Sequence, residues 1–308
     1  MKFIFKILIV IFIIALSGFL INAPQQQTNI PTKQKETILE KNVSDTYKIS
    51  AVKLPETMSF AGERVPLEDP DVRERADREL LVNTYWQSNA LLWIKRAHKY
   101  FPVIEPILKK NGVPDDFKYL AVIESDLLNV TSPAGAKGMW QLLTGAAREN
   151  GLEVNDNVDE RYHLEKATMA ACSYLKSAKQ KFGTWAMAAA AYHAGNNGLD
   201  KRLEEQMVSN YYDVLAGEMT DRYIFRILAA KEIISNPNKY GFYFDDEDLY
   251  ILPASYQVKV DTPITNIAAF AKKYNTYYRE LKIHNPWLRE NKLNNRSGKV
   301  YYIHIPKK

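Results

Sequence analysis

Cysteine is nearly absent from this 308-residue chain, in which Cys172 is the single example. One thiol cannot form an internal disulfide framework or a multi-cysteine metal site. The 5 histidines are scattered and make no HExxH or HxH pair, which argues against a zinc enzyme. We therefore expect the protein to work without a metal and without a cofactor.

Extremes of hydrophobicity and charge are missing as well. With 46% hydrophobic and 25% charged residues, the chain has an ordinary globular composition, which excludes wholesale disorder and a polytopic membrane protein. The formal net charge of +5 is only mildly basic. The length suits about two domains of ~100–200 residues each.

One long apolar run does occur, near the N-terminus. Lys2 and Lys6 are followed by residues 7–23, which carry no charge, and this order is typical of a signal peptide. The run is longer than most signal cores and shorter than the ~20 residues of a membrane-spanning helix. We predict that residues 1–23 are a signal peptide or a membrane anchor and that the protein is exported to the periplasm or cell envelope, held at the membrane by residues 7–23 if they are retained. No cysteine follows the run, so a lipoprotein anchor is excluded.

The next two segments differ in apolar periodicity. Residues 24–70 are rich in Gln, Thr, Lys and Pro, and we interpret them as a flexible linker and lead-in. Residues 71–242 carry apolar side chains at helical spacing, separated by Gly, Pro or Asn, and predict an all-helical domain. The expected helices are 73–100, 103–111, 115–128, 139–150, 165–182, 185–194 and 220–235.

Residues 243–308 have a different character and predict a separate small module. Strands are expected at 249–260 and 299–305 and short helices at 267–274 and 277–283, which gives a βααβ order. Residues 251–308 contain eleven Lys and Arg against three acids, a net of +8, so the preceding 250 residues sum to −3. A basic module therefore follows a near-neutral helical domain.

Glu124 is the most informative single residue. It lies within the apolar stripe of its predicted helix, four residues after Leu120 and seven after Phe117. Burial disfavours the charged carboxylate, so the pKa should rise, as a general acid at neutral pH requires. Two structural alternatives stay open: Glu124 could pair with a buried arginine, or the helix could roll so that the carboxylate reaches solvent. Asp126 lies about 200° around the same helix and should point away.

Three further segments could contribute to a site. A turn of small residues, 131–138, precedes Met139, Trp140 and Gln141, which we expect at a helix start as an apolar wall with one amide. An alanine-rich helix ends at Tyr192 and His193. Tyr223 follows Thr220, a plausible helix N-cap.

In this order and spacing the segments resemble the transglycosylase SLT domain of lytic murein transglycosylases, glycoside hydrolase family 23, which is related to goose-type lysozyme. The matching motifs are Glu124-Ser125, Gly138-Met139-Trp140-Gln141, Ala191-Tyr192-His193-Ala194-Gly195 and the isolated Tyr223. The resemblance is greatest to the membrane-bound lytic transglycosylase D type. It departs at His193, where the family usually has Asn. The fold class implied is mainly α, with a lysozyme-like all-helical catalytic domain.

The resemblance implies cleavage of the β-1,4 bond between N-acetylmuramic acid and N-acetylglucosamine with formation of 1,6-anhydro ends. Glu124 would act first as the general acid and then as the base. Substrate-binding roles are implied for Ser125, Met139, Trp140, Gln141, Tyr192, His193 and Tyr223, with Tyr223 orienting the Glu124 carboxyl. From the residues alone, a capping role for Ser125 and core packing for Tyr192 and Tyr223 stay open.

Residues 256–306 resemble a degenerate LysM domain, a small glycan-binding βααβ fold. Its positive charge suits a polymer that carries peptide carboxylates, and simple packing against the helical domain is the structural alternative. The expected partner is peptidoglycan, together with the membrane if the N-terminal segment is retained, and not nucleic acid. Two other functions remain open: a lysozyme-like hydrolase on the same scaffold, and a non-catalytic wall-binding scaffold.

Overall fold

A computed structural model describes residues 49–307 of the chain. The predicted signal peptide or anchor, residues 1–23, lies outside the described residues, as does the linker up to residue 48. Within residues 49–307, no helix has the length and apolar character needed to cross a membrane.

The lead-in that we grouped with the linker belongs to the folded core. Strands β1 (Ser59–Phe60) and β2 (Glu63–Arg64) form a short antiparallel hairpin. Phe60 is fully buried and its ring packs edge-on against Phe117 at 5.1 Å. Residues before 71 thus contribute to the core of the helical domain. The apolar side chains before the first helix are too few to show a period, but they still fill the core.

The first two helices differ from their predicted bounds. Helix α3 spans Pro70–Tyr85 and α4 spans Gln87–Lys110. The predicted helix 73–100 is therefore interrupted at Trp86. Helix α4 also continues through Pro102 and Pro106, where two helices were expected. Each proline removes one backbone hydrogen bond, and packing of one face of α4 into the core offsets that loss.

The remaining elements of the helical domain are mostly short. The segment predicted as a helix over 139–150 is helical only over Thr144–Glu149, which is α6. Helix α9, over Asn196–Gln206, was not predicted. The bounds are η1 (Asp115–Phe117), α5 (Lys118–Ser125), α6 (Thr144–Glu149), η2 (Glu160–Tyr162), α7 (Leu164–Phe182), α8 (Trp185–Ala194), α9 (Asn196–Gln206), α10 (Glu218–Asp221), α11 (Tyr223–Ser235), η3 (Pro237–Tyr240) and η4 (Asp246–Asp248).

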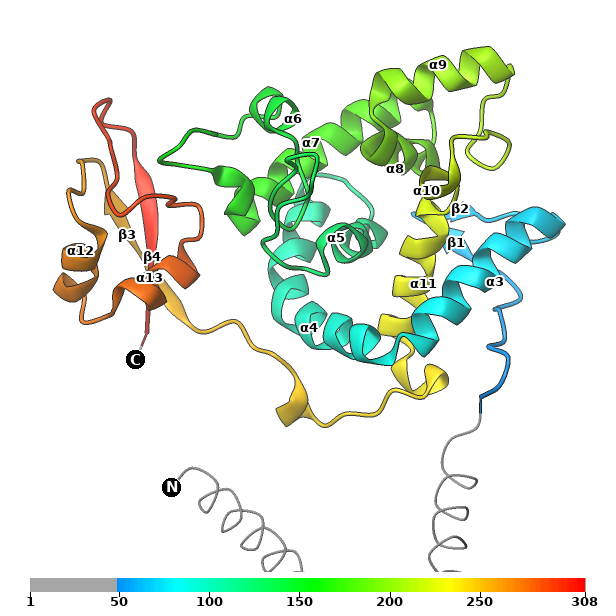
Figure 1. The fold of residues 1–308 in the computed structure, drawn as a ribbon, viewed down its shortest axis with the longest axis horizontal. Helices are drawn as coiled ribbons and strands as arrows, with labels where there is room; N and C mark the ends of the chain where they lie inside the picture. Colours follow the sequence, from blue (N-terminus) through cyan, green and yellow to red (C-terminus); the bar gives the residue numbers. More distant parts are fainter. Residues whose placement is uncertain (1–48, 308) are drawn as a thin grey trace, which may run out of the picture. The chain divides into compact units, whose positions relative to one another are not determined.

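Helix α5 lies near the middle of this domain in Figure 1 and packs against α4 and α11. Every residue of α5 except Glu124 is buried. The predicted burial of Phe117, Leu120 and Leu127 is confirmed, but the helix ends at Ser125 and not at residue 128, and Leu128 is exposed. The one partly exposed position on α5 carries the carboxylate.

The C-terminal module, residues 255–306, has the predicted βααβ order. Strands β3 (Ser255–Val260) and β4 (Tyr301–Pro306) pair antiparallel, with Ser255 opposite Pro306 and Val260 opposite Tyr301. Helices α12 (Ile267–Lys273) and α13 (Tyr278–His284) connect them. The mainly helical fold class with a small strand-containing module is confirmed.

The module packs against the helical domain. Val158 and Tyr162 of the helical domain are 1% and 6% exposed and belong to the hydrophobic core of the module. Backbone hydrogen bonds join the two parts, from Asp159 N to the Trp287 carbonyl at 2.9 Å and from Arg289 N to the Asn157 carbonyl at 2.9 Å. The module thus packs against the helical domain, as the structural alternative proposed. This packing is compatible with glycan binding on another face of the module.

Candidate active site

Glu124 is presented at the C-terminal end of α5, where the helix stops abruptly. Asp126 and Leu127 both adopt left-handed backbone conformations, with φ of 53° and 57°. The Asp126 carboxylate accepts a hydrogen bond from Trp93 Nε1 at 2.6 Å, so it points away from Glu124 as predicted. Glu124 is the one residue of α5 that is partly exposed, while the rest of the helix is buried.

Tyr223 is the hydrogen-bond partner of Glu124. It is the first residue of α11, it is 1% exposed, and its hydroxyl donates to Glu124 Oε1. Burial raises the pKa of Glu124, while the Tyr223 hydroxyl and the charge of Arg226 act to lower it. Burial also raises the pKa of Tyr223 well above its ordinary value, so the hydroxyl remains a neutral donor. The carboxyl is therefore poised to hold a proton at higher pH than an exposed glutamate.

His193 and Arg226 complete the polar surroundings. The His193 ring stacks on Tyr223 with centroids 4.6 Å apart, and partial desolvation of the ring together with the charge of Arg226 lowers its pKa. Arg226 donates from Nη2 to the Ile123 carbonyl at 3.3 Å, which ties α11 to α5. Our sequence reasoning missed Arg226. Its position three residues after Tyr223, on the same helix face, is the signal that could have identified it.

The turn after α5 is fixed by backbone-directed hydrogen bonds. Ser125 is 6% exposed, and its Oγ donates to the Met139 carbonyl at 2.8 Å. The Gln141 amide donates to the carbonyls of Gly138 and Val130, at 2.7 and 3.2 Å. The hydroxyl hydrogen of Ser125 and the amide hydrogens of Gln141 are thus engaged within the protein, and they hold the turn in place beside Glu124.

The prediction that the Trp140 side chain forms an apolar wall of the site is wrong. The Trp140 ring is fully buried, and its Nε1 donates to Thr168 Oγ1 at 2.9 Å. The Tyr192 hydroxyl donates to the Trp140 carbonyl at 2.6 Å, so α8 also supports this turn. Gly138 and Gln141 have positive φ, of 80° and 45°, which breaks the predicted helix and turns the Trp140 side chain into the core.

Two acids that precede α5 are occupied elsewhere. Asp115 accepts from Lys118 Nζ at 2.6 Å. Asp116 accepts from the Ala61 backbone at 2.7 Å and from Lys231 at 2.8 Å. With Asp126 bonded to Trp93, none of the three acids nearest to Glu124 in sequence faces its carboxyl. Within the part of the chain that the structure describes, no cluster of three or more potential metal ligands occurs.

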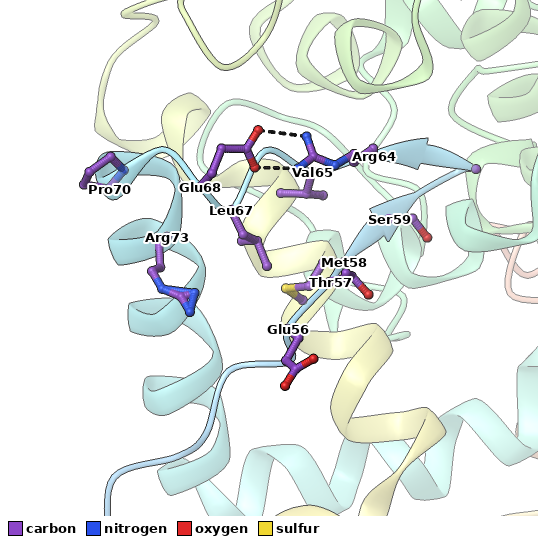
Figure 2. A pocket seen from close by; sticks show the side chains of 11 residues that line it. Glu56, Thr57, Met58, Ser59, Arg64, Val65, Leu67, Glu68, Pro70 and Arg73 are labelled. Atoms are coloured by element: carbon purple, nitrogen blue, oxygen red, sulfur yellow. Dashed lines mark hydrogen bonds and ion pairs between the residues drawn. The ribbon is translucent and has the colours of Figure 1, made fainter.

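A separate hollow of about 790 Å³ lies at the start of the helical domain (Figure 2). Its lining includes Arg64 and Glu68, which form two parallel hydrogen bonds of 2.9 and 2.6 Å. Arg64 holds the pKa of Glu68 below its ordinary value. A general acid needs the opposite shift, so we place the chemistry at Glu124 and not in this hollow.

The comparisons with known proteins agree with the motifs. Residues 101–214 match the family model described as the transglycosylase SLT domain, and residues 256–308 match the soluble lytic transglycosylase C-terminal LysM-like domain. Two curated relatives, each named membrane-bound lytic murein transglycosylase D, come from Escherichia coli strains K12 and O6:H1. Each is 25% identical over 259 residues, which cover 81% of this chain and 55% of the relative. The chain thus spans about half the length of the curated relatives it matches. Tyr223 lies beyond the matched SLT range, and the hydrogen bond to Glu124 connects it to the motifs.

Proposed function

We propose that this chain, which contains a transglycosylase SLT domain followed by a lytic transglycosylase C-terminal LysM-like domain, is a peptidoglycan lytic transglycosylase. It would cleave the β-1,4 bond between N-acetylmuramic acid and N-acetylglucosamine. The observation that carries the proposal is the carboxyl of Glu124, which has a raised pKa and a hydrogen bond from a neutral tyrosine hydroxyl.

The proposed reaction uses one carboxyl group twice. Protonated Glu124 gives its proton to the glycosidic oxygen as the C1–O bond breaks, and the leaving sugar departs with a free hydroxyl. The Glu124 carboxylate then takes the proton from the C6 hydroxyl of the muramic acid, whose oxygen closes on C1 to form the 1,6-anhydro ring. Attack from within the same sugar is favoured by proximity. Glycosidases that use water generally need a second carboxylate across the bond, and the engagement of Asp115, Asp116 and Asp126 elsewhere supports the single-carboxyl scheme.

The other candidate residues divide into two proposed roles. Met139, Gln141 and His193 would contact the sugar, because Gln141 and His193 are at least partly exposed and Met139 lines a hollow beside the site. Ser125, Trp140 and Tyr192 would position the turn through their hydrogen bonds to backbone and to Thr168. Tyr223 would orient the acid.

Glu124→Gln tests the assignment on isolated sacculi. We expect solubilisation to fall by ~10²–10⁴-fold, the usual contribution of a general acid, with an unchanged circular dichroism spectrum. Glu204→Gln, at an exposed position of α9, is the matched control and should retain full activity. Undiminished activity of Glu124→Gln would leave a wall-binding role or another catalytic centre.

Mass spectrometry of the wild-type products separates the two enzyme classes. Anhydro-muramic ends are expected from the transglycosylase. Reducing muramic ends would instead show a lysozyme-like hydrolase on the same scaffold.

We also propose that the protein is exported and acts at the cell envelope, where peptidoglycan lies. The support is the apolar run of residues 7–23 and the membrane-bound relatives. Mass determination of the mature protein decides between a cleaved signal and a retained anchor, and recovery of the protein in the cytosol would refute export.

A further inference from the structure

A second hollow, of about 770 Å³, lies between the helical domain and the C-terminal module. Helix α13 and the loop after it provide one side, and the segment after α5 provides the other. The lining residues are Tyr100, Leu128, Asn129, Thr131, Met139, Tyr162, Tyr278, Arg279, Lys282, Ile283, Pro286 and Arg289.

The hollow is lined by residues of the segments that flank the proposed catalytic group in the chain. Leu128 and Asn129 follow Glu124 by four and five residues in the chain. Met139, which lines the same hollow, accepts a hydrogen bond from Ser125, the residue next to Glu124. A glycan strand held at Glu124 would therefore extend its neighbouring groups into this space.

The charge of the lining is of one sign. It contains three cations and no acid. The Arg289 guanidinium lies over the Tyr162 ring at 4.1 Å and donates to the Pro286 carbonyl at 2.8 Å. Lys282 is tied to the carbonyls of Leu288 and Glu290. Among residues 49–307, the exposed Arg279 guanidinium has neither a hydrogen-bond nor an ion-pair partner, so its five donors face the hollow or solvent.

The loop that carries Arg289 is anchored to the helical domain by the backbone bonds through Asn157 and Asp159 and by the burial of Val158. Both arginine planes suit bidentate recognition of carboxylates. The contacts of Arg289 with Tyr162 and Pro286 already restrain its guanidinium, which reduces the entropic cost of binding at that residue.

We propose that this hollow binds the peptide stem of peptidoglycan through its carboxylates, with Arg279 and Arg289 as the contact residues and Lys282 adding to the local positive charge. This inference rests on the proposed function and deepens it, because it names which part of the polymer the second hollow recognises. The sugar backbone carries no free carboxylate once the lactyl group is joined to the stem, so the stems are the anionic part of the strand. The module would then make the enzyme prefer strands that still carry peptides.

The test compares two substrates with one set of variants. The substrates are glycan strands with stems and the same strands stripped by an amidase, and the variants are Arg279→Gln, Arg279→Gln/Arg289→Gln and Arg296→Gln. Arg296 is an exposed arginine of the same module outside the hollow and serves as the matched control. We expect the double variant to raise KM on stem-bearing strands about five- to tenfold, as for two partly exposed charge pairs, with kcat and the stripped-strand KM unchanged. Added salt should weaken the wild-type preference for stems.

Each other outcome has a definite meaning. Equal effects of the double variant on both substrates, or an equal effect of Arg296→Gln, would overturn stem recognition and leave the lytic activity in place. Absence of wild-type activity on both substrates would instead refute the proposed function. Arg279→Gln alone covers the case in which loss of the Arg289–Tyr162 contact loosens the module, because Arg279 makes no such contact.

Discussion

The hydrogen bond from Tyr223 to Glu124 should affect how both the stability and the activity of the protein depend on pH. Tyr223→Phe keeps the buried ring and removes only the hydroxyl. Burial raises the pKa of Glu124, so the folded protein keeps a proton that the unfolded chain has lost, and stability falls as pH rises from the ordinary glutamate pKa to the raised one. The Tyr223 hydroxyl opposes that shift, and its loss must raise the Glu124 pKa further.

The magnitude follows from the charge of the acceptor. A hydrogen bond to a charged group contributes ~1.5–3 kcal/mol and one to a neutral group ~0.5–1.5 kcal/mol. The difference, about 1 kcal/mol, is the part of the bond that favours the charged carboxylate and so lowers the pKa of Glu124. Tyr223→Phe should therefore cost about 1 kcal/mol at pH 4, where Glu124 is protonated, and about 2–3 kcal/mol above its raised pKa. The alkaline limb of the activity profile should move to higher pH, because the general acid keeps its proton to a higher pH.

Urea unfolding at pH 4 and at a series of higher pH values, together with a pH profile of sacculus solubilisation, checks both effects. Tyr192→Phe is the matched control, since its hydroxyl donates to the neutral Trp140 carbonyl and its loss should cost the same at every pH. If Tyr223→Phe lost equal stability across the whole series and left the alkaline limb unmoved, the reasoning about Glu124 would be refuted.

Two further predictions concern the scaffold. Gly138→Ala should destabilise the fold by about 3 kcal/mol or more, because φ is +80° and the new Cβ would lie 1.9 Å from the Arg161 carbonyl oxygen. Gly135→Ala has a similar φ of +81° in open space and should cost only about 1 kcal/mol; equal losses of urea stability would contradict the close-packing argument. Val158→Ala should lower the free energy of unfolding by about 2 kcal/mol. It should speed amide hydrogen exchange in the C-terminal module more than in α5. An equal increase in both would show that Val158 does not anchor the module.

Local patterns predicted the scaffold well where the pattern is strong. The apolar residues around Glu124 predicted a buried helix, which is found over residues 118–125 with Glu124 as its one partly exposed position, and the βααβ order of the C-terminal module is confirmed. The prediction failed over residues 139–143. There the apolar residues suggested a helix, but the positive φ of Gly138 and Gln141 produces a turn. The destination of the Trp140 ring depends on Thr168, which is 28 residues away and invisible to a local pattern.

Sequence alone determined the order of the elements, the family resemblance and the identity of the candidate acid, because periodicity and motif spacing are properties of short segments. The family resemblance also implied that Tyr223 orients that acid, and the two residues form a hydrogen bond across 99 residues. Only the tertiary structure decided the burial of Glu124 and added Arg226, which acts on it from the same late helix. The tertiary structure likewise turned the basic C-terminal region into a docked module, through the burial of Val158 and Tyr162. A pKa and an interface both depend on which distant groups share a buried volume, and that is settled only when the chain packs.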